Sequence, residues 1–336
     1  MMRLPSSRGP VSEAVIAALT SGTLAEVVVR PSPDPLADED IQLSLWLLYS
    51  LHYEGLDDVD PALEWDPELI RLRRSLEGLV LDALRTRTAE VVDQVADGEA
   101  ALADRIFELC DSFPGPSVAR FIQREATADQ FAELLVHRSI YNLRETDPQM
   151  FAMPRLPGRA QVAMAELAYD EYGGGHPDRL HSLLYARAME QCGLVSEPGG
   201  YVDSVPATTL AVVNVMHLFA LRRELAPASA GHYGVFEATS SAPSKQLASG
   251  AERLGLPDAV RDYFEEHVEA DAVHEQLVLR DICGALVDHD RANEPVVLFG
   301  AASCLVVEAA AGEVLLQAWQ DGRSSLREAT GERVAS

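Results

Sequence analysis

The amino-acid sequence predicts an all-α protein. Alanine, leucine, glutamate and arginine are abundant in its 336 residues, and alternating runs of β-branched residues are scarce. In most windows the apolar residues recur every three or four positions, which is the period of a helix with one buried face. Only the short run 27–30 looks strand-like. A chain of this length can form one large domain or two modest ones, each with a substantial core.

The predicted helices follow from apolar stripes and from helix-start signals. The first three stripes lie at residues 43–51, 69–80 and 131–143. A proline-rich entry and an acidic first turn precede the first stripe, and Asp66-Pro67 opens the second. Further helices are expected at about 161–171, 178–193, 207–224, 243–252, 257–285 and 293–319. Breaks rich in proline and glycine are expected at 113–116, 147–157, 173–177, 196–200 and 227–231.

Charge and cysteine content limit the partners and the location. The formal net charge is −26, from 53 acidic and 27 basic residues. Such a surface repels phosphate groups, so binding of nucleic acid or anionic membrane through a basic patch is not expected. The four cysteines are scattered without a CxxC pair, which argues against a zinc ribbon and a disulfide framework. No signal peptide or membrane-spanning segment is expected, and the predicted location is cytoplasmic.

Residues 265–274 carry the strongest chemical signal. His267, Asp271 and His274 stand at i, i+4 and i+7, so on a helix they fall within about 60° of one another. Two imidazoles and a carboxylate on one face suit a first-row metal such as iron or manganese. The alternative is an acidic surface helix with two incidental histidines. Apolar neighbours at 263–264 and 277–278 favour a buried face, where the triad would need a cation.

A metal site in a helical bundle draws further ligands from other helices. Glu237 lies among small and apolar residues, where a buried carboxylate needs a partner; a surface loop is the alternative. Glu171 and His181 flank the glycine-rich segment 173–177, which must break the helix. His176 competes with His181 as a ligand. We favour His181, because it lies among leucines in the next helix, whereas His176 lies in the turn.

Together these spacings resemble one family. A glutamate is followed after nine residues by a histidine, and a lone glutamate comes about thirty residues before His-x3-Asp-x2-His. This arrangement resembles the haem-oxygenase-like di-iron oxidases and oxygenases, the iron-containing redox enzymes. The resemblance covers about residues 115–320 and implies a haem-oxygenase-like helical bundle with an N-terminal helical extension. The regions expected are an N-terminal helical region at 1–112, the di-iron core at 113–325 and a flexible tail at 326–336.

The resemblance also implies cofactors and a ligand set. The expected cofactors are two Fe(II) ions with O2 as co-substrate, without haem. Glu145, in a segment that resembles the family, corresponds to an extra carboxylate that some members use as an iron ligand. Glu145 and Glu237 are the implied catalytic residues, and Glu237 is the candidate bridge between the irons. Four carboxylates would cancel the charge of two ferrous ions. The implied metal ligands are Glu145, Glu171, His181, Glu237, His267, Asp271 and His274.

The expected activity is oxidation of a small amino acid or amine in natural-product biosynthesis. Family outcomes include N-oxygenation, desaturation, cyclisation and C–C cleavage. A fatty-acid decarboxylating oxidase of the same fold is one alternative, and a metal-free helical enzyme or binding protein is another. Arg138, Arg144 and Lys245 are candidates for holding a substrate carboxylate, although an ordinary surface cation is the commoner role of each. An external electron donor and a homodimer formed through the apolar C-terminal helix are further expectations.

Overall fold

The computed structural model describes residues 2–96 and 98–327, with the side chains at 269–272 left outside the description. Over these residues the secondary structure is helical, and the one β-bridge is the isolated pair Met2 and Leu56. The predicted all-α class is therefore confirmed. The α-helices are α1 Pro10–Ser21, α2 Glu39–Ser50, α3 Pro67–Ala96, α4 Leu102–Ser112, α5 Val118–Arg124, α6 Ala128–Asn142, α7 Asp147–Met150, α8 Gly158–Glu171, α9 His181–Gln191, α10 Ala207–Leu221, α11 Ala226–Ala238, α12 Ser241–Leu254, α13 Asp258–Gln276, α14 Gly284–His289 and α15 Glu294–Gln320.

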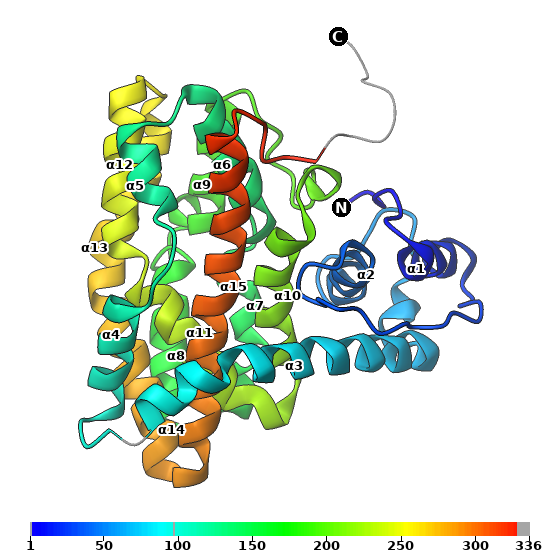
Figure 1. Cartoon of the computed structure of the whole chain (residues 1–336), viewed down its shortest axis with the longest axis horizontal. Coiled ribbons are helices and arrows are strands. Elements are labelled where there is room, and N and C mark those ends of the chain that lie inside the picture. Colours follow the sequence, from blue (N-terminus) through cyan, green and yellow to red (C-terminus); the bar gives the residue numbers. More distant parts are fainter. Residues whose placement is uncertain (1, 97, 328–336) are drawn as a thin grey trace.

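The bundle is organised around α11 and α15, which pack along each other (Figure 1). On one side, α12 and α13 pack together and carry α5 and α9 on their outer faces. On the other side, α10 contacts α11 and α15, and α2 covers α10. Helix α3 crosses the lower half of the bundle in Figure 1 and contacts both α15 and α2, and α1 packs on α2. The interior reached by α6, α8, α9, α11 and α13 holds the candidate site.

The N-terminal helices share their core with the bundle. Leu43 and Leu47 on α2 and Leu76 on α3 are fully buried in one apolar cluster that also contains Phe219 of α10. Helix α4 packs against α11 and α15. The predicted division between residues 112 and 113 stays a prediction. In the tail expected at 326–336, the amide of Arg327 donates to the carbonyl of Ser204 at 2.8 Å, and residues 328–336 lie outside the described residues.

The break predicted at 227–231 is wrong, because these residues lie inside α11. Pro227 occupies the first turn, where its missing N–H costs no helical hydrogen bond. Gly231 is needed for packing: a Cβ atom there would lie 2.0 Å from the carbonyl oxygen of Val297 on α15. Gly300 makes the reciprocal approach to the carbonyl of Ala228, also at 2.0 Å. The glycines therefore let two helix backbones touch, and they do not end a helix.

Two other segments differ from the predicted pattern. Residues 27–30 form no strand; Val27 and Val29 pack half-buried against the N-terminal apolar cluster. The helix predicted at 257–285 is continuous but changes type, from α13 through the π-helix η6 Leu277–Cys283 to α14. Such π-helical turns inside α-helices are frequent at functional sites. Here the turn begins three residues after His274.

One helical segment, Arg291–Gln320, is long and apolar enough to cross a membrane by length and composition. The expectation that no segment has this character is therefore wrong for this helix. Inside the protein 56% of its most apolar window is buried, and α15 packs against α3, α10 and α11. A helix that is apolar on all sides is also what the centre of a large helical core requires.

Candidate metal centre

Helix α13 presents His267 and His274 toward the interior, seven residues apart on one face. The side chains are 7% and 1% exposed, so the surface-helix alternative does not describe them. His267 donates its Nδ1 hydrogen to the carbonyl oxygen of Tyr263 at 2.8 Å. That bond places the hydrogen on Nδ1 and leaves Nε2 as the atom with a lone pair. Asp271 lies between the two histidines on the same helix, and its side chain is outside the described residues.

Glu171 and His181 meet across a glycine turn. Glu171 is the last residue of α8, and His181 is the first of α9. Gly173 has φ 86, and a Cβ atom there would lie 2.4 Å from the carbonyl oxygen of His176, so the turn requires glycine. The turn brings Oε2 of Glu171 to 3.1 Å from Nδ1 of His181. His181 is 3% exposed, whereas His176 lies exposed in the turn.

Two more buried glutamates complete the cluster. Glu237 comes from the last turn of α11, with Oε2 at 3.5 Å from Nδ1 of His274. Glu145 comes from the loop after α6, with Oε1 at 3.4 Å from Nε2 of His267. The next residue, Thr146, has φ 71, a strained value for a β-branched residue. Its hydroxyl donates to Oε2 of Glu171 at 3.2 Å, which links the loop to α8.

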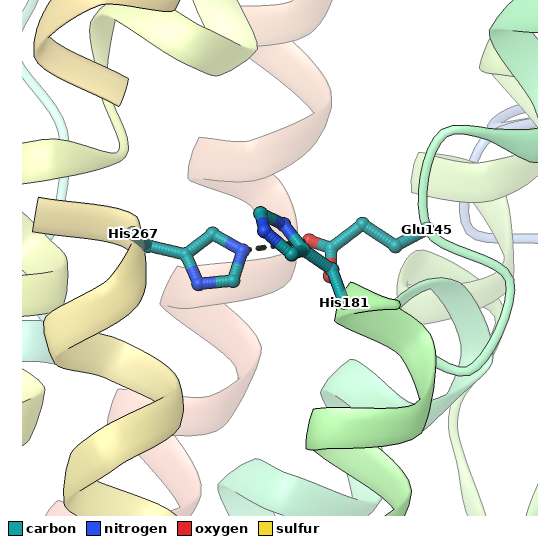
Figure 2. Close-up of side chains that lie close together, drawn as sticks. All are labelled: Glu145, His181 and His267. Carbon is teal, nitrogen blue, oxygen red and sulfur yellow. Dashed lines mark ion pairs between the residues drawn. The ribbon is translucent and has the colours of Figure 1, made fainter. Parts of the chain in front are cut away.

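The ligand-type side chains form two groups of three. One group is Glu145, His181 and His267, and within it the three potential ligand atoms lie within 4.8 Å of one another. Figure 2 shows these side chains pointing toward one another from three different segments.

The second group is Glu171, Glu237 and His274, with the same limit on its ligand atoms. Glu171 connects the groups, because Oε1 lies 3.2 Å from Nδ1 of His274 while Oε2 lies near His181 of the first group. The structure thus brings together six of the seven predicted ligands.

The three buried carboxylates, Glu145, Glu171 and Glu237, have no arginine or lysine partner among the described residues. Burial lowers the pKa of His274, but Glu171 and Glu237 outweigh it and raise that pKa to about 11. Burial and the charge of Glu171 raise the pKa of Glu237, while contacts with His181 and His274 overcome burial and lower the pKa of Glu171. The cluster therefore favours a positive charge at its centre.

The donor set fits metal ions. Nδ1 of His181 and Nδ1 of His274 are buried and make no aligned hydrogen bond, although carboxylate oxygens lie close to both. A cavity of about 20 Å³ lies beside Glu145, Glu171, Glu237 and His267, and a volume near 10–15 Å³ already holds a water molecule. Imidazole nitrogen and carboxylate oxygen without thiolate suit iron or manganese. The other ring nitrogen of His274, Nε2, lies 3.6 Å from Oδ2 of Asp170, which belongs to neither group.

Comparison with known proteins places the chain in a family. The family model of the iron-containing redox enzymes matches residues 132–309, which is more than half of the chain. This chain belongs to the iron-containing redox enzyme family. The matched range contains every residue of the two ligand groups. Membership supports an oxidoreductase that contains iron and has the haem-oxygenase-like helical fold.

Two relatives of this iron-containing redox enzyme are more distant. A nitrosourea synthase from Streptomyces achromogenes subsp. streptozoticus is 29% identical over 147 residues, covering 44% of this chain. The match spans only 31% of the length of that relative. A crystal structure of a CADD-like protein of unknown function from Nostoc punctiforme is similar with a TM-score of 0.47 and 16% identity, covering 70% of this chain and 97% of the other.

Of the three basic residues predicted to hold a substrate, the structure places one beside the cluster. Arg138 borders the same small cavity as Glu145 and His267. Arg144 lies instead over the ring of Tyr53, with its guanidinium carbon 4.3 Å from the ring centre, and Lys245 is exposed on α12. Sequence reasoning missed Tyr263 as a partner of Glu145. Tyr263 stands four residues before His267, and this helical spacing was the available signal.

Proposed function

We propose that this chain is a non-haem di-iron oxidase that uses O2 to oxidise a small amino-acid-like substrate. One observation carries the proposal: two buried three-ligand groups of mixed imidazole and carboxylate donors are joined by the two oxygens of Glu171. Dinuclear sites in helical bundles are built in this way, from glutamates and histidines on facing helices. Because its two oxygens lie near histidines of both groups, Glu171 would help to hold both ions, a role predicted from the sequence for Glu237.

Charge supports two ferrous ions over one. Glu145, Glu171 and Glu237 supply three negative charges in the interior, and Asp271 on the same helix as His274 would supply a fourth. Two ferrous ions would then leave the buried site neutral, which avoids a large desolvation cost. The irons would supply binding and reduction of O2. The protein residues hold the ions, exclude bulk water and fix the imidazole tautomers through hydrogen bonds such as that of His267 to Tyr263.

Two observations support an amino-acid-like substrate. The similarity to a nitrosourea synthase covers less than half of this chain, and it favours a role in natural-product oxidation. The cationic side chain of Arg138 at the edge of the metal cavity is suited to a substrate carboxylate. N-oxygenation, desaturation, cyclisation and C–C cleavage all need a substrate held beside the irons.

The test measures metal content and oxygen consumption together. The purified protein is loaded with ferrous iron without oxygen, and we expect about two irons per chain, as in bundle di-iron sites. His181→Ala and His274→Ala should each lower the iron content. His176→Ala is the matched control, because this histidine is exposed in the turn beside His181, and it should keep the wild-type content.

Oxygen consumption then separates the alternatives. A di-iron oxidase should consume O2 faster when one member of an amino-acid, amine and fatty-acid panel is present. Loading with iron but no oxygen consumption would support a binding protein instead. No loading, with panel turnover unchanged in His274→Ala, would support a metal-free enzyme, and either result would overturn the proposal.

A further inference from the structure

A second and larger cavity lies next to the metal cavity. It has a volume of about 330 Å³, is partly open to solvent, and is lined by residues of α5, α6, α10, α11, α12 and α15. Such a volume is at the lower end of the range for small-molecule sites, about 300–1,000 Å³. Most of its wall is apolar, with Leu134, Val213 and Phe236 among its members. Asn142, Phe236, Ser240 and Arg138 line both cavities, so the two spaces adjoin.

Arg138 is a cation without an ion-pair partner in this wall. It stands on α6 between Leu134 and Asn142, which lie four residues before and after it on the same face. It is half-buried, and its guanidinium makes no hydrogen bond or ion pair among the described residues. The contrast with Arg105 is clear: that buried arginine bonds to Glu294 and to the carbonyls of Val95 and Ala96.

Glu308 is a carboxylate that lines the same cavity and has no ion-pair partner within the part of the chain that the structure describes. It interrupts the apolar face of α15 and lines the cavity beside Cys304 and Gly312. Its side chain is exposed and lines the cavity, and it has no hydrogen bond or ion pair among the described residues. Partial desolvation by the surrounding protein raises the pKa of Glu308, and the charge of Arg138 lowers it. Among the described residues, Arg138 and Glu308 form no ion pair with each other, although the charge of Arg138 acts on Glu308.

We propose that this cavity binds an α-amino acid as its zwitterion, with the substrate carboxylate on Arg138 and the ammonium on Glu308. The apolar wall would take a largely apolar side chain. This proposal rests on the proposed function for the reaction that follows binding, and it specifies the substrate class. A zwitterion satisfies both unpaired charges, whereas a fatty acid would leave Glu308 facing hydrocarbon and a simple amine would leave Arg138 without an anion.

The position of Arg138 also orients the ligand. Arg138 borders both cavities, while Glu308 borders only the larger one. The carboxylate end of the substrate would therefore lie nearest to the ligand group that contains Glu145 and His267. Asn142, Phe236 and Ser240 also line both spaces, and their side chains would contact the substrate at this boundary.

The test compares ligands that differ by one charged group. Binding of L-leucine, L-methionine and L-phenylalanine is measured by calorimetry, together with the matching carboxylic acids without the amino group and the matching amines without the carboxyl group. The iron-loaded protein without oxygen is used first, and the metal-free protein is used in parallel. We expect the best amino acid to bind at least about tenfold more tightly than either single-charge analogue, since each loses one charge-assisted contact.

Two variants assign the charges. Glu308→Gln should remove the protein's preference for the amino acid over the carboxylic acid. Arg138→Gln should remove the protein's preference for the amino acid over the amine. If either residue had only a structural role, its substitution would weaken the binding of all three kinds of ligand alike. Glu313→Gln and Lys245→Gln are the controls, because these exposed residues lie on α15 and α12 outside the cavity wall. Both controls should keep the wild-type order of affinities.

Three outcomes would overturn the assignment: carboxylic acids that bind as tightly as amino acids, variants that leave the order unchanged, or no binding by any compound in either form of the protein. Arg138 and Glu308 pairing with each other in solution would produce the last result. Failure of the proposed function is a separate event, because it is measured as absent iron or absent oxygen consumption, while amino-acid binding is recorded independently of both.

Discussion

The hydroxyl of Tyr263 donates a hydrogen bond of 2.9 Å to Oε2 of Glu145. The backbone carbonyl of the same tyrosine accepts the Nδ1 hydrogen of His267. One residue of α13 therefore positions two members of one ligand group, although it is not itself a ligand-type residue of that group. Partners of this kind fix the orientation of metal ligands and adjust metal affinity.

Tyr263→Phe should weaken iron binding by about tenfold or more, because it removes the hydroxyl that holds Glu145. The measurement is ferrous-iron affinity by competition with a chelator. Tyr185→Phe is the matched control: this buried tyrosine packs against Tyr263, but its hydroxyl donates to the carbonyl of Leu135. An equal loss of affinity in both variants would mean that packing, and not the bond to Glu145, explains the effect.

Glu171→Gln and Glu145→Gln should differ in iron content. Glu171 reaches histidines of both groups, whereas Glu145 belongs to one. We expect Glu145→Gln to keep about one of the two irons typical of such bundles, and Glu171→Gln to retain neither firmly. Metal analysis after gel filtration checks this. Glu166→Gln, exposed on the same helix as Glu171, should resemble the wild type; identical losses in the first two variants would contradict a bridging Glu171.

Gly231→Ala should destabilise the fold by about 3 kcal/mol, the upper range for overpacking, since its Cβ atom would meet the backbone of Val297. Gly234→Ala, on the same helix, would instead meet the flexible end of Leu279 at 2.5 Å and should cost less. Gly78→Ala meets nothing within 4 Å in the interior of α3 and should stabilise by about 0.5–1 kcal/mol. Denaturant unfolding measures all three, and equal costs for Gly231 and Gly234 would refute the close helix crossing.

Acid should destabilise the protein partly through His232. Burial lowers the pKa of this histidine from 6.5 to about 3, and its Nε2 atom has no hydrogen bond. Between those values the unfolded state binds a proton that the folded state does not, so stability falls as the pH drops below 6.5. His232→Leu should remove this dependence and gain about 2 kcal/mol relative to wild type between pH 7 and pH 5. Parallel unfolding curves at both pH values test it; an unchanged difference between the two proteins would refute it.

The sequence predicted the helical class and most helix positions because apolar periodicity records which face each helix buries. It predicted that His267 and His274 lie on the same face of one helix, because helical spacing alone places them there. It did not predict helix α11, because Gly231 was interpreted as a break. The close approach of Val297 that explains this glycine comes from a helix about seventy residues later in the chain.

The adjoining cavity was not predicted from the sequence. Glu308 was a visible signal, a carboxylate inside the apolar run of α15, but nothing local shows that Arg138 lines the same cavity. Residues that line a cavity come from distant segments and need not share a spacing. The same reason explains why Tyr263 escaped notice, since its partner Glu145 lies 118 residues away.

The contact between Gly231 and Val297 has a consequence for how the protein tolerates change. Helix α11 carries Glu237 at its end, and α15 carries Glu308. Because the two backbones touch at Gly231 and Val297, this contact would help to set the spacing between the ligand groups and Glu308. A substitution that widens this contact would shift the organic molecule relative to the metals without altering any residue that touches either, and the expected symptom is misdirected oxidation with iron still bound.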